Sequence, residues 1–112
     1  MGISVPAKRI REKFWIIYEL EGCQKAVNFL AEYYGVRRMK IVLDGKKVGK
    51  RYYAIYSRNK AYFTKRGLKK KTVLHELYHH LVKEKGLELL DSIEERQAIS
   101  YAREFLEQAN CL

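Results

Sequence analysis

The stretch Thr72-Val73-Leu74-His75-Glu76-Leu77-Tyr78-His79-His80-Leu81-Val82 contains the pattern His-Glu-x-x-His. Residues four apart lie on one face of an α-helix, so the imidazoles of His75 and His79 can meet at one point. Two neutral imidazole nitrogens with an open position for water suit a zinc ion. Glu76 follows the first histidine directly, where its carboxylate can take a proton from that water. The stretch therefore predicts a zinc site on a helix, with His75 and His79 as ligands and Glu76 as a general base.

The residues around the motif independently predict a helix. Apolar side chains recur at three- and four-residue spacing, which turns them toward a core. They are Leu74, Leu77, Tyr78 and Leu81. The alternative interpretation is a buried helix whose histidines only pack. All three histidines of the chain fall at positions 75–80, and two of them have ligand spacing. This concentration favours the metal site.

Length and composition predict a single domain, residues 1–112, with a modest core. No apolar run is long enough to span a membrane, and the apolar cluster 14–18 is bounded by charges, so we expect no signal peptide and no membrane partner. The two cysteines, Cys23 and Cys111, fit neither a disulfide framework nor a ligand pair. We therefore expect a cytoplasmic protein, with Cys111 on a mobile tail.

The N-terminal part of the chain has the spacing of one helix or two. From Lys8 to Tyr34, apolar residues recur every three or four positions, and Glu21-Gly22-Cys23 offers a break. Gly35 is a natural helix stop. We expect one or two helices that end before this glycine.

The middle of the chain has the period of strands. Segments 39–44, 52–57 and 61–64 are rich in aromatic and β-branched residues and predict three short strands. Residues 44–49 have turn chemistry, and Arg58-Asn59-Lys60 forms a tight connection. The sequence therefore predicts a small three-stranded sheet that is mainly antiparallel.

Two helices are predicted after the sheet. Thr72 is a candidate N-cap for the helix that carries the motif, and Gly86 would end that helix. A last helix is expected from about Ile93 to Ala109. N-terminal helices, a small sheet and two further helices together make an α+β fold.

A catalytic zinc site needs a third protein ligand besides two histidines. The pattern HExxHxxGxxH would place Gly and His at positions where this chain has Val82 and Lys85, which excludes that solution. A carboxylate from the following helix is the other common solution. The last helix offers two candidates, Glu94 and Glu95.

The faces of the last helix distinguish these two carboxylates. Glu95 lies on a stripe whose small residues would let the helix approach the histidines closely. The stripe continues through Ala98, Ala102, Phe105 and Ala109. Ser92-x-x-Glu95 also fits a capping box, which would occupy this carboxylate, but Asp91-x-x-Glu94 fits one too. We expect Glu95 as the third ligand and keep Glu94 as the alternative.

At this point the chain resembles a known family. Residues 75–79, followed by Glu95-x-x-Ala98-x-x-Tyr101-Ala102, are similar to the gluzincin metallopeptidases of the ImmA/IrrE type and to their small relatives, the minigluzincins. That family has HExxH on one helix and a glutamate on the next, in a context like E-x-x-A-N-x-F-A. This chain departs from it at Ile99 and Tyr101, and its interval between the motif and Glu95 is short. The specific match covers residues 72–106.

The resemblance implies a zinc-dependent peptidase with a minimal zincin-like fold. It implies three zinc ligands, His75, His79 and Glu95, and a general base, Glu76. The substrate would be a protein or peptide, which can pair with an exposed strand edge near the cleft.

The resemblance supplies no residue that stabilises the transition state. Tyr78, His80 and Tyr101 are candidates only by proximity. Since His80 is rotated away from the face of the two ligands, we expect it to be a surface or packing residue.

The formal net charge of +10 permits binding to nucleic acid, to anionic membranes or to acidic proteins. The cationic clusters at 46–51 and 65–71 add to this expectation. Several tyrosines in or beside the predicted sheet are interleaved with Lys46, Lys47, Lys50, Arg51, Arg58 and Lys60 and could form a base-stacking surface with them, or could serve as amphipathic packing. These tyrosines are Tyr33, Tyr34, Tyr52, Tyr53, Tyr56 and Tyr62. We expect weak, non-specific nucleic-acid binding that falls with salt.

Two alternative functions follow from the same residues. One is a basic nucleic-acid-binding or regulatory protein with a structural or vestigial zinc. The other is a protease recruited to DNA, like the SprT-type peptidases, which use a histidine as third ligand. The sequence indicates neither the substrate nor the oligomeric state.

Overall fold

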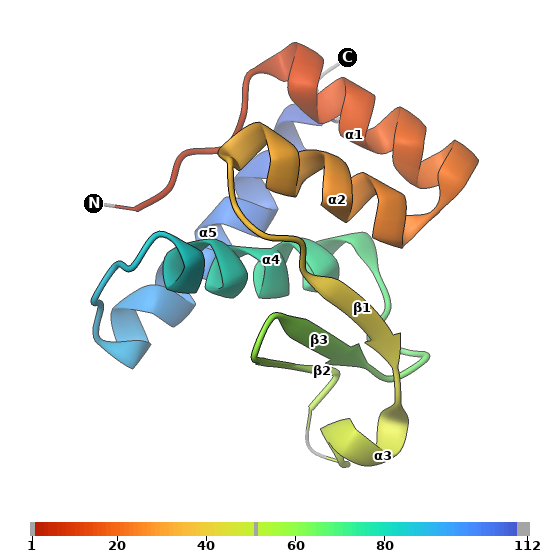
Figure 1. Cartoon of the computed structure of the whole chain (residues 1–112), viewed down its shortest axis with the longest axis vertical. Helices are drawn as coiled ribbons and strands as arrows, with labels where there is room; N and C mark the ends of the chain where they lie inside the picture. Colours follow the sequence, from red (N-terminus) through yellow and green to blue (C-terminus); the bar gives the residue numbers. More distant parts are fainter. Residues whose placement is uncertain (1, 51, 110–112) are drawn as a thin grey trace.

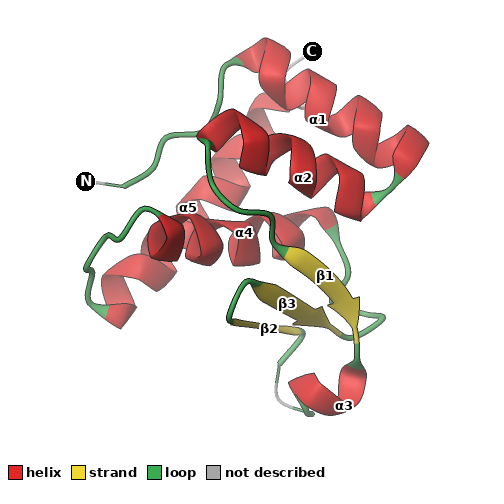
Figure 2. Cartoon of the chain, viewed as in Figure 1, coloured by secondary structure: helices red, strands yellow, loops and turns green. Residues whose placement is uncertain are grey.

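A computed structural model describes residues 2–50 and 52–109 of the chain. The described part contains helices at both ends and a small sheet between them (Figure 2), which confirms the predicted α+β class. The elements are α1 (Lys8–Glu21), α2 (Cys23–Tyr34), β1 (Lys40–Leu43), α3 (Gly45–Val48), β2 (Ala54–Ser57), β3 (Lys60–Phe63), α4 (Lys70–Glu84) and α5 (Asp91–Ala109). No described helix is long and apolar enough to cross a membrane.

The N-terminal helix is split, as the sequence allowed. Gly22 separates α1 from α2 with φ of 98°, a conformation that favours glycine, and its N–H donates to the carbonyls of Ile17 and Tyr18. Gly35 ends α2 in the left-handed region, with φ of 70°. The two helices therefore form a hairpin, at the top of Figure 1.

The sheet is mixed, with the strand order β1-β3-β2. β2 and β3 form the expected antiparallel hairpin, whose two turn residues, Arg58 and Asn59, both have positive φ. β1 pairs in parallel with β3, which differs from the mainly antiparallel sheet that the sequence predicted. β3 is the central strand, which agrees with the full burial of its side chains Ala61 and Phe63. β2 is therefore an edge strand.

The predicted turn after β1 is instead the one-turn helix α3. The Asp44 side chain caps it by accepting a hydrogen bond from the backbone N–H of Lys47 at 3.2 Å. This helix and the segment after it carry the chain past β3 to the far edge of the sheet.

The helix that carries the motif begins earlier than predicted. The N-cap position is Lys69 and α4 starts at Lys70, so Thr72 is not its N-cap. A lysine in a first turn opposes the helix dipole. The Lys70 ammonium is compensated by the Glu19 carboxylate of α1, 2.9 Å away, and lies 4.9 Å from the centre of the Trp15 ring. α4 ends two residues before Gly86, as expected.

α4 lies at the centre of the molecule (Figure 1). α5 packs along it, the α1–α2 hairpin lies on one side, and the sheet lies on the other. The predicted apolar face of α4, Leu74, Leu77, Tyr78 and Leu81, is buried in a core that includes Phe14, Leu30, Phe63 and Phe105. This packing leaves the two motif histidines on the other face of α4, toward α5 and β2.

The structure describes one of the two cysteines. Cys23 is a free, half-buried thiol at the start of α2, and burial raises its pKa to about 11. Cys111 lies outside the described residues, and so does the prediction about its mobility.

Candidate metal centre

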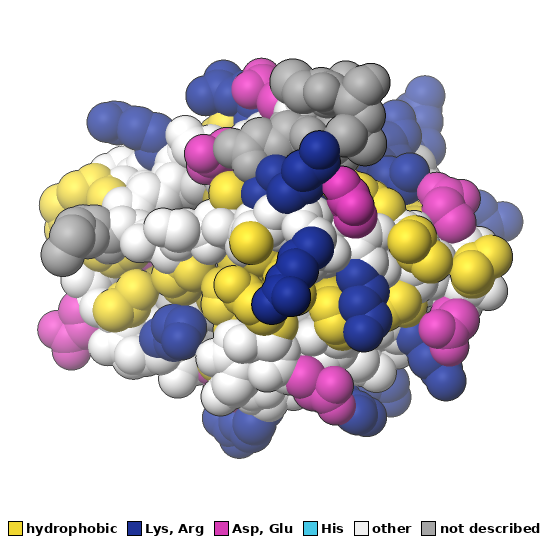
Figure 3. Space-filling view, turned by 90° about the horizontal axis from the view of Figure 1, so that it is seen from above, with side chains coloured by type: hydrophobic (Ala, Val, Ile, Leu, Met, Phe, Trp, Pro, Cys, Tyr) yellow, Lys and Arg dark blue, Asp and Glu magenta, His cyan; other side chains and the backbone are white. Residues whose placement is uncertain are grey.

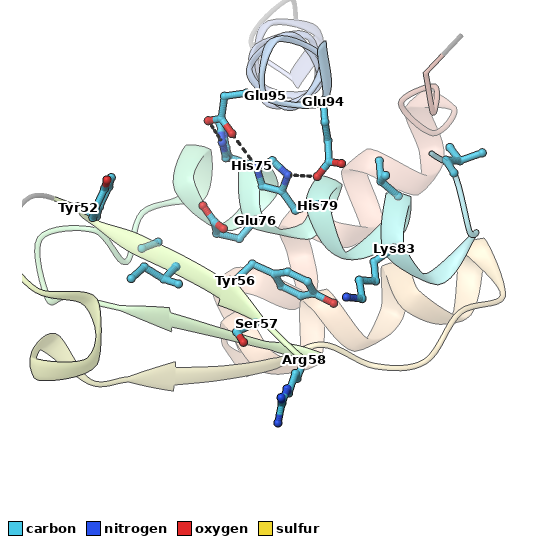
Figure 4. Close-up of a pocket in the computed structure, with 14 residues that line it drawn as sticks. Tyr52, Tyr56, Ser57, Arg58, His75, Glu76, His79, Lys83, Glu94 and Glu95 are labelled. Atoms are coloured by element: carbon cyan, nitrogen blue, oxygen red, sulfur yellow. Dashed lines mark hydrogen bonds and ion pairs between the residues drawn. The ribbon is translucent and has the colours of Figure 1, made fainter. Parts of the chain in front are cut away.

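Three predicted ligands come together between α4 and α5 (Figure 4). Nε2 of His75 lies 2.7 Å from Oε1 of Glu95, and Nε2 of His79 lies 3.0 Å from Oε2 of the same carboxylate. One ligand atom from each residue lies within 4.8 Å of the other two. Two imidazole nitrogens and one carboxylate in such a group could hold a metal ion.

Glu94 has a different place. Its carboxylate accepts a short hydrogen bond from Nδ1–H of His79, on the side of the ring away from Glu95 (Figure 4). A proton on Nδ1 leaves the lone pair of the neutral ring on Nε2, which is the atom that faces Glu95. Glu94 therefore fixes the tautomer and orientation of His79, while Glu95 is the candidate ligand.

The packing of α5 explains why Glu95 reaches both histidines. Ala98 and Ala102 are fully buried, and such small side chains let α5 approach α4 closely. The carbonyl of Leu90 accepts hydrogen bonds from the N–H groups of Ile93 and Glu94 at the start of α5. Both glutamate side chains are thus turned to the histidines and are not used as helix caps.

Burial controls the protonation of the site. The pKa of Glu76 is raised to about 7, mainly by burial; the positive charge of His79 opposes this rise, and the negative charge of Glu95 adds to it. The Glu76 side chain is only 8% exposed. Burial also lowers the pKa of His75, although Glu95 opposes this effect. A histidine with a lowered pKa stays neutral and keeps a lone pair for a metal, so the donor set fits a metal ion.

A cleft of about 860 Å³ opens beside these residues. α4 and α5 form one wall, which we call the helical wall, and the edge strand β2 forms the other, the strand wall. Figure 4 shows Glu76 between the two walls and the Tyr56 ring below His79. The cleft is also lined by Tyr52, Ser57, Arg58, Val82, Lys83 and Leu87. A cleft with an open strand edge along one side can accept an extended chain.

His80 joins the two walls. It is fully buried, as the packing prediction implied. Its Nε2–H donates to the backbone carbonyl of Arg37 at 2.6 Å, because a carbonyl can only accept. Nδ1 therefore carries the lone pair and accepts a hydrogen bond from the Tyr56 hydroxyl, 2.7 Å away. No local pattern predicts this pair, since the two residues are 24 positions apart.

None of the three candidates named by proximity lines the cleft. The Tyr78 hydroxyl donates to Gln97 at 2.8 Å and accepts from the N–H of Ile3. The Tyr101 hydroxyl is bonded to that of Tyr34 at 2.8 Å. The tyrosines that do line the cleft are Tyr52 and Tyr56, which the sequence analysis had assigned to the sheet and to a possible base-stacking surface.

No protein-family model matches the chain, and no curated protein or solved structure matches it. The resemblance to gluzincin metallopeptidases therefore stays a prediction from the residues that carry it.

Proposed function

We propose that the protein is a zinc-dependent peptidase. The observation that carries this proposal is the position of Glu95, whose two carboxylate oxygens each face one histidine of the HExxH motif. Glu76 lies beside them in the same cleft. A buried carboxylate next to a group of metal-binding side chains is the arrangement that metal-assisted hydrolysis needs.

His75, His79 and Glu95 would hold the metal. Two imidazoles with one carboxylate is a ligand set found in catalytic zinc sites. When bound there, zinc supplies a Lewis acid that lowers the pKa of water and polarises a carbonyl group.

The side chains of this protein have distinct tasks in the proposed reaction. Glu76 accepts a proton from the attacking water and passes it to the leaving amine. Glu94 keeps the His79 ring in place.

The strand wall is the proposed place for the peptide. β2 pairs with β3 on one side, and its other side faces the cleft. An extended peptide can add to such an edge through backbone hydrogen bonds. This mode of binding favours unfolded segments over compact proteins.

The test is the variant Glu76→Gln, assayed on casein as a generic unfolded substrate. We expect zinc to remain bound and cleavage to fall by about 10²–10⁴-fold, the usual contribution of a general base. Glu21→Gln is the control, because Glu21 is an exposed glutamate at the end of α1. Mass spectrometry of the products measures the cleavage, and elemental analysis measures the zinc.

The same variant distinguishes the alternative functions. If the zinc is structural or vestigial, Glu76→Gln changes neither metal content nor any activity of the protein. If cleavage of casein survives Glu76→Gln undiminished, the carboxylate has no chemical role and the proposed mechanism is wrong.

A further inference from the structure

The positive charge of the protein is concentrated in one part of the chain. Residues 37–71 contain 14 of the 23 Lys and Arg residues, but only one of the 13 Asp and Glu residues, Asp44. The rest of the chain has 9 basic and 12 acidic residues. The net charge of this segment is therefore +13, and that of the rest of the chain is −3. The segment forms the sheet, α3 and the start of α4.

The sheet topology gathers many of these charges at one end. β1 and β3 are parallel and β2 is antiparallel to them, so the ends of β1 and β3 lie beside the start of β2. The segments 44–50, 52–53 and 64–69 therefore meet there, and the Thr64 N–H donates to the Tyr53 carbonyl at 3.1 Å. Six exposed cations of these segments define what we call the basic sheet end. They are Lys46, Lys47, Lys50, Lys65, Arg66 and Lys69.

These six cations have no acidic partners. Within the described residues none of them forms an ion pair, and the side chain of the nearby Asp44 caps α3. Other cations are paired: Arg37 with Glu84, and Arg38 with Glu32. The face formed by α1 and α2 also differs, since Figure 3 shows basic and acidic side chains interspersed on it. The basic sheet end is therefore a region of uncompensated positive potential.

Two aromatic side chains project beside these cations. Tyr52 is 60% exposed and Tyr53 is 62% exposed. The ammonium of Lys47 lies 5.5 Å from the centre of a third ring, Tyr62. The other tyrosines that the sequence had suggested for base stacking are in α2 or, like Tyr56, are bonded inside the fold. Among the described tyrosines, Tyr52 and Tyr53 are therefore the two that are highly exposed and also lie beside cations without an ion-pair partner.

We propose that the basic sheet end binds single-stranded nucleic acid. Unpaired cations beside exposed aromatic rings match the requirements of such a strand, whose phosphates need cations and whose unstacked bases need flat partners. An acidic protein fits less well, because interfaces between proteins are depleted in lysine, and five of the six cations are lysine. A membrane surface would need a broad apolar face beside the cations. The proposal does not depend on the peptidase activity.

The position of the tyrosines places this surface next to the candidate metal centre. Tyr52 and Tyr53 line a small cavity together with Lys71, His75 and Glu95. A bound strand would therefore lie at the entrance of the cleft.

The experiment measures binding of the full chain to a fluorescent 16-nucleotide oligothymidylate by anisotropy. Six phosphate contacts on a single strand predict an affinity that falls by about 300-fold between 50 and 200 mM salt. Polyglutamate of equal charge and phosphatidylserine vesicles are the competitors. We expect the oligonucleotide to bind at least about tenfold more tightly than polyglutamate, because stacking on tyrosine adds to the charge attraction.

A matched pair of variants locates the surface. The first variant removes four charges of the basic sheet end, with Lys46→Gln, Lys50→Gln, Lys65→Gln and Arg66→Gln. The control removes four exposed charges of the helices, with Arg9→Gln, Lys13→Gln, Lys25→Gln and Arg103→Gln. Both lower the net charge by the same amount. We expect at least tenfold weaker binding for the first variant and less than a threefold change for the control.

A second pair tests stacking. Tyr53→Ala should weaken binding by about 5- to 100-fold, whereas Tyr33→Ala, which removes an exposed tyrosine from α2, should not. The proposal is overturned if both charge variants lose affinity equally, or if Tyr53→Ala has no effect. It is also overturned if polyglutamate or the vesicles compete as well as the oligonucleotide, since the surface would then be selective for charge alone. Circular dichroism of each variant verifies the fold.

Discussion

The helical wall and the strand wall of the cleft are built in opposite ways. The helical wall takes two polar groups from positions four apart on α4 and a third from the neighbouring helix, and these side chains bond to one another. The strand wall offers the backbone of β2, whose position depends on a hydrogen bond from Tyr56 to His80 on α4. The helical wall presents polar side chains to the cleft, and the strand wall presents the unpaired backbone edge of β2.

For the proposed peptidase, this difference predicts that metal binding and peptide binding can be changed separately. Metal binding should depend on the side chains of α4 and α5 and tolerate changes in β2. Placement of an extended peptide should depend on β2 and tolerate small changes in α5. The predictions below test this separation, starting with the largest expected effect.

Removal of the third ligand should have the largest effect on the helical wall. We expect Glu95→Ala to lower zinc affinity by at least about 10³-fold, near 4 kcal/mol, because two histidines alone leave the ion incompletely held. Competition with a fluorescent chelator at neutral pH measures this affinity. Glu107→Ala, an exposed glutamate further along α5, is the control. An unchanged zinc affinity in Glu95→Ala would show that the group in Figure 4 is not a metal site.

Glu76 lies between the two walls, and its burial predicts that the stability of the zinc-free protein depends on pH. Burial raises its pKa in the folded state to about 7 from an ordinary value of 4.5. Between these values the folded state binds more protons than the unfolded state, so stability falls as pH rises from about 4.5 to about 7. At about 1.4 kcal/mol per pKa unit, the loss approaches about 3 kcal/mol.

Urea denaturation with a chelator at pH 5 and pH 8 measures this loss. Glu76→Gln cannot ionise, so its stability should exceed that of the unchanged protein at pH 8 and show a weaker dependence on pH. The exposed Glu21→Gln should behave like the unchanged protein. A Glu76→Gln variant that keeps the full pH dependence would assign the effect to other groups.

The two walls also differ in how far the sequence predicts them. His75 and His79 are local on one helix, so the 3.6-residue period is enough to bring them together. Glu94 and Glu95 fit the same local patterns, and only the contact between α5 and α4 decides which one faces both histidines. The grouping of side chains in the helical wall was therefore predictable, except for the choice between the neighbouring residues Glu94 and Glu95.

The strand wall depends on contacts between distant residues. No local sequence pattern predicts that β1 pairs in parallel with β3 or that β2 lies at the edge of the sheet. The start of α4 was also misassigned, because Lys70 is stabilised by Glu19 of α1, which is 51 positions away. The local preference for Thr72 as a cap carries no information about a partner at that distance.

A smaller effect is expected from the residue that orients a ligand. Glu94→Ala should weaken zinc binding by about 10- to 100-fold, because His79 loses the acceptor that fixes its tautomer. Glu94→Gln should have a weaker effect, since its amide oxygen can still accept from Nδ1–H. The chelator competition used for Glu95 measures both. Equal losses in Glu94→Ala and Glu95→Ala would mean that both carboxylates bind the metal directly.

The smallest effect should come from the hydrogen bond that joins the walls, and it should affect peptide binding without affecting zinc. Tyr56→Phe removes the hydroxyl that donates to Nδ1 of His80 and accepts from the backbone N–H of Asn59, and it leaves the buried nitrogen of His80 without its partner. An unsatisfied buried acceptor costs about 1–3 kcal/mol, and we expect a loss of stability near 1 kcal/mol because the rings keep their packing. Tyr62→Phe is the matched control, since Tyr62 is directly opposite the residue before Tyr56 in the sheet and is also half-buried.

In the proposed peptidase, Tyr56→Phe should raise KM for an unfolded substrate by about 2- to 5-fold, the size expected for about 0.5–1 kcal/mol of weaker binding. Zinc affinity should stay within about twofold, because none of the three ligands contacts this hydroxyl. If zinc affinity falls together with peptide binding, the two walls act as one unit, and the separation drawn between them is wrong.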